Sequence, residues 1–470
     1  MTYHIPHEYY FRVHHIRPRF KNDVEDVLIF VAVEISKIPR STKQEFMQKV
    51  NDAIRRYPGN APKKIKTINN WRTEISSLFG LVEYGASYGE CWSSAMANNL
   101  AVNQDLVEFF KYFLFYFQYP GGHLKPHETL KYIRAGVRFK PARYILDLLS
   151  KAEKTTGNRF GITRAELTHC VFNDLRVTRD GRSVDQVIDL IHHNREHGVS
   201  YDWEGDVIRY AGDILDYMVI ADLLVVHGNK YYLNLNARES IVAFLESELH
   251  FGMYDTLYKK PDLKLEDVNA FQADWFHYVN QRIESDVFRT NLFKYLGIDE
   301  AIYSRLPADL DEYIQELKEK GAVMTKEVGD IGEYLVHGHE CMKLKKGGRK
   351  DLIPLVKRIP SAFAVGYDIN SVELDETKRL IEVKTTISSS KISFTKFHLT
   401  PNEWKAAESF DGRYFIYRLM VSKAGTRLFV IRDPVGRYKS DGVEMTPGDG
   451  VEISFTKRSG NWEELLVWKE

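Results

Sequence analysis

The chain has 470 residues, of which 44% are hydrophobic, and this allows roughly two to four folded domains with ordinary buried cores. Lysine and arginine together number 65, as do aspartate and glutamate, so the formal net charge is zero. This balance excludes a polycationic protein, and any strongly basic surface must therefore be local.

The start of the chain and its cysteines indicate the compartment. The opening stretch MTYHIPHEYYFRVHHIRPRF lacks the apolar core of a signal peptide. The aromatic run FFKYFLFYF at 109–117 contains Lys111 and is too short to cross a bilayer, and its helical spacing predicts a core helix. The three cysteines, Cys91, Cys170 and Cys341, form neither a CxxC pair nor an even disulfide set. We therefore expect a cytoplasmic protein with no membrane partner.

A basic run lies in the segment 1–140, which we predict to be a helical recognition region. No acidic residue occurs from Arg55 to Arg72, and the overlapping stretch 67–84 carries apolar residues at helical spacing. Lysine binds backbone phosphates, whereas asparagine and arginine are residue types that read bases. The candidate DNA contacts of this segment are Lys63, Lys64, Lys66, Asn69, Asn70 and Arg72. A scaffold or partner-binding role is the alternative.

The segment 141–262 combines helical patterns with a hairpin pattern. A helix is predicted over 142–152, a second one starts at Thr163 and Arg164, and a β-hairpin turns at Gly228 and Asn229. Helices followed by such a hairpin are typical of a winged helix-turn-helix. We therefore predict a winged-helix-like region over 141–262 and a helical connector over 263–320.

The segment 321–470 changes to strand patterns after residue 363. The stretch 380–387 is apolar and β-branched, and its period of two puts Glu382 and Lys384 on the same face. The stretch 363–369 reads as a second strand, with a turn in the acidic run that separates the two strands. Such a hairpin brings Asp368 close to Glu382.

A third acidic group belongs to a predicted helix. Gly329 precedes the helical pattern that contains Glu333. Carboxylate oxygens can hold Mg²⁺ or Mn²⁺, and a nearby lysine can orient a water molecule and stabilise charge on a phosphoryl group. The arrangement therefore indicates metal-dependent phosphodiester cleavage, with Asp368 and Glu382 as metal ligands and Lys384 beside the water. For an isolated E-x-K pattern, a solvated strand face with an ion pair is the simpler interpretation.

Four motifs occur in order over 328–417: GDIGE, GYDI, IEVKTT and FHLTPNEWKAA. This pattern resembles the PD-(D/E)XK nuclease superfamily, and more closely the domain at the C-terminus of the NO VEIN protein and of bacterial restriction and defence proteins. The resemblance implies an α/β restriction-endonuclease-like domain in which Asp368 and Glu382 bind the metal ion. It also implies that Lys384 assists the water and that Glu333 is the helix-borne acid. One departure is that Gly366-Tyr367 replaces the proline that precedes the aspartate.

Further candidate DNA contacts flank these motifs. A basic cluster between residues 343 and 358 contains a single acid, and we select Lys345, Lys346 and Arg349 from it. Asn402 starts a helix predicted around 404–409, with Thr400 as its N-cap. A solvated charge run and simple helix capping are the respective alternatives.

We therefore predict a multidomain protein with a mainly α, winged-helix-like N-terminal region and an α/β nuclease domain over 321–470. The predicted function is Mg²⁺-dependent, sequence-specific cleavage of double-stranded DNA by a type II restriction enzyme. Separate recognition and cleavage regions would make it IIS-like. We also expect a homodimer on DNA and a cognate methyltransferase. The alternatives are a modification-dependent restriction nuclease and a non-catalytic DNA-binding or assembly subunit.

Overall fold

The protein is described here by a computed structural model. It covers residues 2–469 except 15–17, 19, 21–22, 58, 86–88, 204–205, 282–285, 291–294, 296–327, 360–364, 390–395, 424 and 449. The chain forms two compact units, Met1–Val102 with Leu106–Phe288 and Asn103–Asp105 with Arg289–Glu470. Most of the predicted connector 263–320 lies outside the described residues, and its described start contributes two helices to the first unit.

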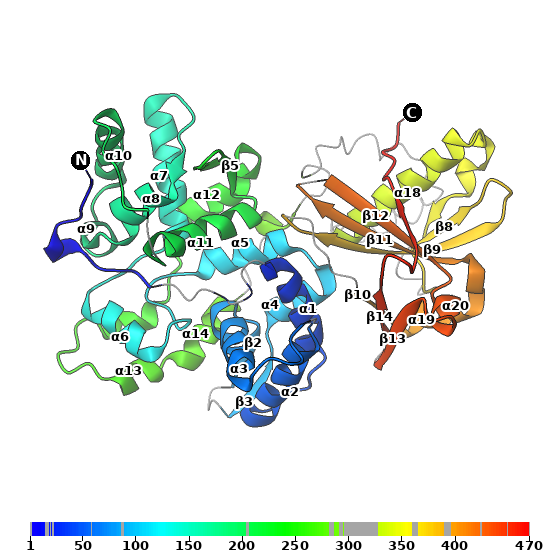
Figure 1. Ribbon diagram of the computed structural model, residues 1–470, viewed down its shortest axis with the longest axis horizontal. Helices are drawn as coiled ribbons and strands as arrows, with labels where there is room; N and C mark the ends of the chain where they lie inside the picture. Colours follow the sequence, from blue (N-terminus) through cyan, green and yellow to red (C-terminus); the bar gives the residue numbers. More distant parts are fainter. Residues whose placement is uncertain are drawn as a thin grey trace, which may run out of the picture. The chain divides into compact units, whose positions relative to one another are not determined.

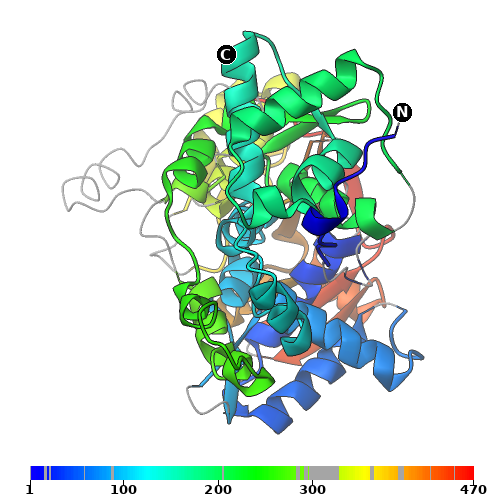
Figure 2. The ribbon, with the colours of Figure 1, turned by 90° about the vertical axis from the view of Figure 1, so that its left-hand side faces the viewer.

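The first unit is built mainly from helices (Figure 2). Its helices are α1 (Val24–Ser36), α2 (Lys43–Arg56), α3 (Ile65–Thr73), α4 (Ala95–Asn103), α5 (Leu106–Tyr116), α6 (Pro126–Arg134), α7 (Pro141–Thr156), α8 (Arg164–Leu167), α9 (Leu175–Thr178), α10 (Val184–Glu196), α11 (Asp206–Ile220), α12 (Arg238–Glu246), α13 (Leu265–Asn269) and α14 (Gln272–Val279). Short 3-10 or π-helical turns occur at His7–Tyr9, Glu74–Leu78, Thr168–Phe172, Leu235–Ala237, Gly252–Thr256 and Asp286–Phe288.

Two small antiparallel sheets in this unit have the same topology. Their strands are β1 (Ser41–Thr42), β2 (Val82–Tyr84), β3 (Glu90–Ser93), β4 (Ile162–Thr163), β5 (Leu224–His227) and β6 (Lys230–Leu233). The sheet orders are β1-β3-β2 and β4-β6-β5. In each case a helix precedes a short strand, further helices lead to a hairpin, and the short strand pairs with the second strand of the hairpin. The same order of elements therefore occurs twice.

The core of the first unit contains the aromatic run as a buried helix, which confirms the prediction. Phe110 on α5 is fully buried and stacks on Tyr217 of α11, with 5.4 Å between ring centroids. Phe79 packs against the same cluster, 5.3 Å from Phe113. In the described part of the chain, no helix is both long and apolar enough to cross a membrane.

The second unit is centred on a six-stranded sheet of order β15-β12-β11-β9-β8-β7, with a smaller sheet of order β10-β14-β13 (Figure 1). The strands are β7 (Lys357–Arg358), β8 (Ile369–Val372), β9 (Lys378–Ile387), β10 (Lys396–Leu399), β11 (Tyr414–Ser422), β12 (Gly425–Arg432), β13 (Val443–Gly448), β14 (Gly450–Phe455) and β15 (Asn461–Glu463). The helices are α18 (Val328–Lys346), α19 (Pro401–Phe410) and α20 (Pro434–Lys439), with 3-10 turns at Lys350–Leu355 and Asp411–Arg413. Strands β9 and β11 are parallel, and the other pairs of the large sheet are antiparallel.

The two faces of β9 meet different helices. Gly332 of α18 lies so close to the side chain of Thr385 that a β-carbon there would overlap it. On the opposite face, Lys384 reaches Glu403 of α19. Because alternate residues of a strand point to opposite faces, β9 presents its acidic and basic motif residues toward α19 and its apolar neighbours toward α18.

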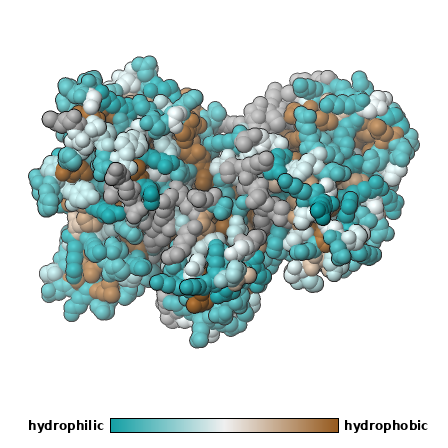
Figure 3. Space-filling model, in the orientation of Figure 1, coloured by the Kyte–Doolittle hydropathy of each residue, from teal (hydrophilic) through white to brown (hydrophobic). Residues whose placement is uncertain are grey.

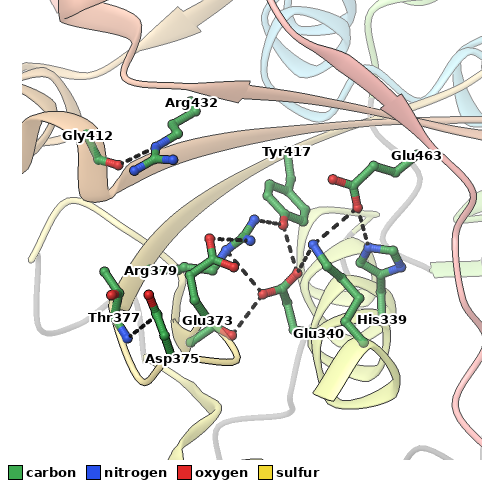
Figure 4. Close-up of polar contacts among 12 residues, drawn as sticks. His339, Glu340, Glu373, Asp375, Thr377, Arg379, Gly412, Tyr417, Arg432 and Glu463 are labelled. Carbon is green, nitrogen blue, oxygen red and sulfur yellow. Dashed lines mark hydrogen bonds and ion pairs between the residues drawn. The ribbon is translucent and has the colours of Figure 1, made fainter. Parts of the chain in front are cut away.

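A buried polar network joins α18 to the sheet (Figure 4). Glu340 is only 2% exposed, and it accepts hydrogen bonds from the Tyr417 hydroxyl at 2.7 Å and from the Ser371 hydroxyl at 2.8 Å. The Arg379 guanidinium lies 3.5 Å from the same carboxylate and also pairs with Glu373 at 2.8 Å. These contacts connect α18 with β8, β9 and β11. Figure 3 shows one face of the protein, and hydrophilic residues predominate among the coloured residues on it.

Candidate active site

Asp368 and Glu382 lie side by side because β8 and β9 form an antiparallel hairpin. The Asp368 amide donates to the Ile381 carbonyl at 2.9 Å, and the Val383 amide donates to Asp368 Oδ2 at 2.8 Å. These two bonds fix the Asp368 carboxylate against the backbone that flanks Glu382. The first strand starts at Ile369, later than the stretch 363–369 predicted, and residues 363 and 364 lie outside the description.

Glu382 and Lys384 project from the same face of β9, as their spacing predicts. Glu382 is 3% exposed, and its Oε1 lies 2.7 Å from the Lys384 ammonium. Burial raises the pKa of Glu382, and the nearby carboxylates of Asp368 and Glu403 raise it further against the opposing effect of Lys384. Burial alone would lower the pKa of Lys384, but these carboxylates raise it, so the ammonium stays charged.

Glu333 comes from α18, and the predicted helix is confirmed. Its carboxylate pairs with the Arg358 guanidinium at 2.8 Å, and that guanidinium stacks over the Tyr334 ring at 3.7 Å from its centroid. Burial, followed by the negative charge of Asp368, raises the pKa of Glu333 to about 8. Arg358 therefore brings a second cation to the edge of the site, and the motif pattern alone did not single it out.

Glu403 is a second residue that the sequence reasoning did not assign to the site. Its Oε2 accepts from the Lys384 ammonium at 2.9 Å. The predicted helix is present as α19, and Thr400 is its N-cap in a capping box with Glu403. The Thr-x-x-Glu spacing is the signal that could have placed this carboxylate at a helix terminus, although nothing in that spacing points to Lys384.

The backbone two residues before Asp368 requires a glycine. Gly366 has a φ of +83°, which lies in the left-handed region that favours glycine. A β-carbon at this position would come within 2.5 Å of the Asn402 carbonyl oxygen. The Gly366 carbonyl also accepts from the buried Tyr414 hydroxyl at 2.8 Å. The glycine thus lets the chain approach α19 just before Asp368.

Arg418 supports Lys384 from the neighbouring strand β11. It lies beside Lys384 in the parallel register, is fully buried, and donates to the Lys384 carbonyl oxygen at 2.9 Å. Burial lowers the pKa of Arg418 to about 9. Its second donor reaches Gln104 at 2.9 Å. Arg418 therefore holds the backbone that carries the lysine, and Gln104 in turn fixes Arg418.

The donor chemistry of the site fits a hard divalent cation. In the part of the chain that the structure describes, no group of three or more His, Cys, Asp or Glu residues could hold a metal ion. Asp368 and Glu382 remain as a pair of oxygen donors, and Mg²⁺ is commonly bound by one or two carboxylates together with substrate phosphates. Burial raises the pKa of both groups, so a cation that neutralises them would be favoured there.

Each of the two units contains a region that matches a known protein family. Residues 3–276 match the family described as the N-terminal part of restriction endonuclease BpuJI, over more than half of the chain. The chain belongs to this family. Residues 332–431 match the C-terminal region of protein NO VEIN, which confirms the resemblance to that domain, and the match includes the candidate site.

One solved structure has the fold of the first unit, and a second shows only a weak likeness. The BpuJ1 endonuclease binding domain, in complex with pyrene- and phenanthrene-modified DNA, is 24% identical with a TM-score of 0.52, covering 58% of this chain and 99% of that chain. Restriction endonuclease FokI bound to DNA is 11% identical with a TM-score of 0.24, over 79% of this chain and 76% of that chain. No curated protein matches the chain.

Within the BpuJI-family region, the six candidate DNA contacts lie on or beside α3. Lys64 is its N-cap and is exposed, as is Lys66, whereas the Lys63 ammonium lies 4.5 Å from the centroid of the Trp71 ring. Asn69 accepts from the Asn51 amide at 3.2 Å. Asn70 and Arg72 are half-buried. The three lysines thus gather at the start of this helix, and Arg72 lies in its last turn.

The helix predicted over 67–84 is shorter than expected. The π-helical turn ends at Leu78, and residues 82–84 form β2. Gly80, with a φ of +66°, ends the helical course, and the alternation that follows belongs to a strand. The helical prediction was therefore wrong for its last part. The spacing of the apolar residues after Gly80 fits both a helix and a strand, so it could not distinguish them.

The candidate DNA contacts of the second unit differ in whether their side chains are free to contact DNA or are paired within the unit. Lys346 and Asn402 are exposed, and Lys345 donates to the Lys469 carbonyl at 2.7 Å. Arg349 pairs with both Asp351 and Glu376 at 2.8 Å. Arg349 is thus already paired with two carboxylates inside the unit, which makes it a weaker candidate for binding a phosphate.

Proposed function

We propose that this chain is a Mg²⁺-dependent, sequence-specific DNA endonuclease, a IIS-like type II restriction enzyme with a PD-(D/E)XK-type centre. The observation that carries the proposal is the assembly of Asp368, Glu382 and Lys384 on β8 and β9, in a chain of the BpuJI N-terminal family. Recognition is assigned to the first unit and cleavage to the second. The two units would then read and cut DNA at separate places.

The reaction is hydrolysis of a phosphodiester. A water oxygen forms a bond to phosphorus, one phosphorus–oxygen ester bond breaks, and the products are a phosphomonoester end and a hydroxyl end. Asp368 and Glu382 would hold Mg²⁺, which supplies charge neutralisation and a more acidic water. The chain itself contributes buried carboxylates, around which electrostatic interactions are stronger than in water.

Lys384 is the residue we place beside the reacting phosphate. Its ammonium is kept charged by Glu382 and Glu403, so it can orient the attacking water and stabilise negative charge on the phosphoryl oxygens. Glu333, the helix-borne acid, holds Arg358 near Asp368 as a second positive group. Lys384 is held by two carboxylates and Arg358 by its hydrogen bond to Glu333 before substrate arrives, which reduces the cost of ordering them.

DNA binding by the first unit is supported by its family and its topology. The solved relative is a complex with modified DNA. The helices α7, α8 and α11 followed by the β5–β6 hairpin, with β4 as the third strand, have the element order of a winged helix. We assign direct DNA contacts to Lys63, Lys64, Lys66, Asn69, Asn70 and Arg72, and contacts near the cleavage site to Lys345, Lys346, Arg349 and Asn402.

The assembly proposed on DNA is a homodimer, because one centre per chain cuts one strand at a time. Host protection by a cognate methyltransferase belongs to the same proposal. If methylated DNA were cut instead of unmodified DNA, the chain would be a modification-dependent restriction nuclease. Binding without turnover would make it a DNA-binding or assembly subunit.

Plasmid cleavage tests this function. Purified protein is incubated with unmodified and with methylated plasmid, in Mg²⁺ and in EDTA, beside the Glu382→Gln variant. We expect discrete fragments from unmodified plasmid in Mg²⁺ alone, and none from the variant, because that substitution removes a metal-binding charge while keeping the shape of the side chain. Fragments that persist with Glu382→Gln would contradict the site assignment.

Neutralising the basic start of α3 should weaken DNA binding. For the triple variant Lys63→Ala, Lys64→Ala and Lys66→Ala, the slope of log binding constant against log salt should fall by up to about 3, because each lost phosphate contact removes about 0.9. Fluorescence anisotropy in EDTA over a series of salt concentrations measures this. The matched control removes three exposed lysines elsewhere in the unit, Lys154, Lys259 and Lys264, and an equal change there would assign the effect to total charge.

A further inference from the structure

The carboxylate of Glu403 is fixed by the start of α19. The Thr400 amide donates to Glu403 Oε2 at 3.0 Å, and the Glu403 amide donates to the Thr400 hydroxyl at 3.3 Å. This reciprocal pair is a capping box, which satisfies two amides that the helix itself leaves unpaired. The position of the carboxylate is therefore set by the helix terminus and does not depend on the strand that it faces.

The same oxygen of Glu403 binds Lys384. The ammonium lies 2.9 Å from Glu403 Oε2 and 2.7 Å from Glu382 Oε1, so two carboxylates on different elements share one cation. Burial alone would raise the pKa of Glu403, but the Lys384 charge and the hydrogen bonds around the cap lower it, so the group stays ionised. Lys384 thus has a partner on β9 and a partner on α19.

Capping alone does not need a charge at this position. A capping box forms with glutamine as well as with glutamate, because either side chain can accept from the N-cap amide. The negative charge of Glu403 is therefore surplus to the cap, and the ion pair with Lys384 is the contact that uses it. Removing the charge but keeping the amide acceptor separates the two roles within one side chain.

We propose that Glu403 is a positioning residue for Lys384, holding its ammonium in place when a divalent cation engages Glu382. This inference rests on the proposed nuclease function. A cation on Glu382 competes with Lys384 for the same oxygen, and the lysine would then swing away from the phosphate if β9 held it alone. The fixed carboxylate on α19 keeps the ammonium where it is. Glu403 would act on the reaction only through Lys384.

The central variant is Glu403→Gln, and Glu408→Gln on the exposed side of α19 is its control. In single-turnover cleavage with Mg²⁺, Glu403→Gln should be slower by about 10- to 100-fold, the loss expected for a hydrogen bond to a charged group. DNA affinity in EDTA should stay at the wild-type value. In a Lys384→Met background the added Glu403→Gln change should slow cleavage no further. An equal slowing in both backgrounds would overturn the proposal, as would cleavage by Glu403→Gln at the wild-type rate.

A second readout needs no cleavage. In cation-free protein, acylation of Lys384 by an amine-reactive reagent, followed by mass spectrometry, reports how firmly the ammonium is held. Glu403→Gln should raise the labelling rate several-fold, whereas Thr400→Ala, which weakens the cap but keeps the charge, should lower stability and leave labelling unchanged. Unchanged labelling in Glu403→Gln would overturn the inference. A wild-type protein that cuts no DNA would overturn the proposed function alone, because the labelling comparison still stands.

Discussion

Replacing Lys384 by methionine should slow single-turnover DNA cleavage by about 100- to 1,000-fold, the loss typical of removing one preorganised group that stabilises developing charge. The same change should strengthen binding of a divalent cation. The Lys384 ammonium lies 2.7 Å from Glu382 Oε1, so it competes with a cation for that oxygen. Methionine removes this competitor and keeps an unbranched side chain of similar length. Opposite changes in rate and in cation binding are thus the signature of the proposed site.

Isothermal titration with Mn²⁺ measures the cation affinity, and quenched-flow cleavage measures the rate. Lys405→Met on the exposed surface of α19 removes a lysine close in sequence to the site without touching it, and it should change neither quantity. Weaker or unchanged Mn²⁺ binding by Lys384→Met, relative to wild type, would rule out the competition between lysine and cation. DNA affinity in EDTA should remain unchanged, since recognition is assigned to the first unit.

The parts of the site that lie on single regular elements could be predicted from the sequence. The strand period places Glu382 and Lys384 on one face of β9, and the helical pattern places Glu333 on α18. The acidic turn after β8 predicts the hairpin that sets Asp368 beside β9. In each case a local pattern, either the spacing of apolar residues or a turn sequence, decides the geometry, so no long-range information is needed.

Contacts between elements could not be predicted in the same way. Glu403 reaches Lys384 because the chain crosses from β9 to β11 through α19, and the packing angle of that helix is not encoded in any local period. The pairing of Arg358 with Glu333 likewise depends on β7 lying at the edge of the sheet. These partners can be identified only when the order of the strands in the sheet is known.

Clusters of charge in the sequence were a poor basis for predicting which residues contact DNA. Arg349 belongs to a basic cluster in the sequence, yet it pairs with Asp351 and Glu376 in the folded unit. A run of like charges in sequence becomes a surface only if the fold brings no acids next to it. The repeated order of elements in the first unit is likewise not visible in the sequence, because the same topology can occur twice without a repeated sequence.

Replacing Glu340 by alanine should destabilise the second unit by about 3–5 kcal/mol, the cost of leaving one partner of a buried ion pair uncompensated. Glu340 is 2% exposed and is the carboxylate on which Tyr417, Ser371 and Arg379 converge. Without it, Arg379 loses one of its two carboxylate partners and keeps the ion pair with Glu373 and the hydrogen bond to the Tyr417 hydroxyl, while remaining 5% exposed. The two hydroxyls would also lose their acceptor. The variant therefore loses the polar contacts that connect α18 with the sheet and leaves buried polar groups unsatisfied.

Hydrogen exchange followed by mass spectrometry on the full chain locates this effect, because it reports opening free energies segment by segment. Protection should fall in α18, β9 and β11 and stay unchanged in α5 of the first unit. Glu340→Gln should cost less than alanine, since its amide oxygen still accepts from one of the two hydroxyls, which contact different oxygens of Glu340. Glu408→Ala on the surface of α19 should cost almost nothing. Equal losses for glutamine and alanine would mean that the charge opposite Arg379 carries the whole effect. Unchanged protection in all three variants would show that the joint adds no stability, and the position of Glu333 on the same helix would then have to be maintained by apolar packing alone.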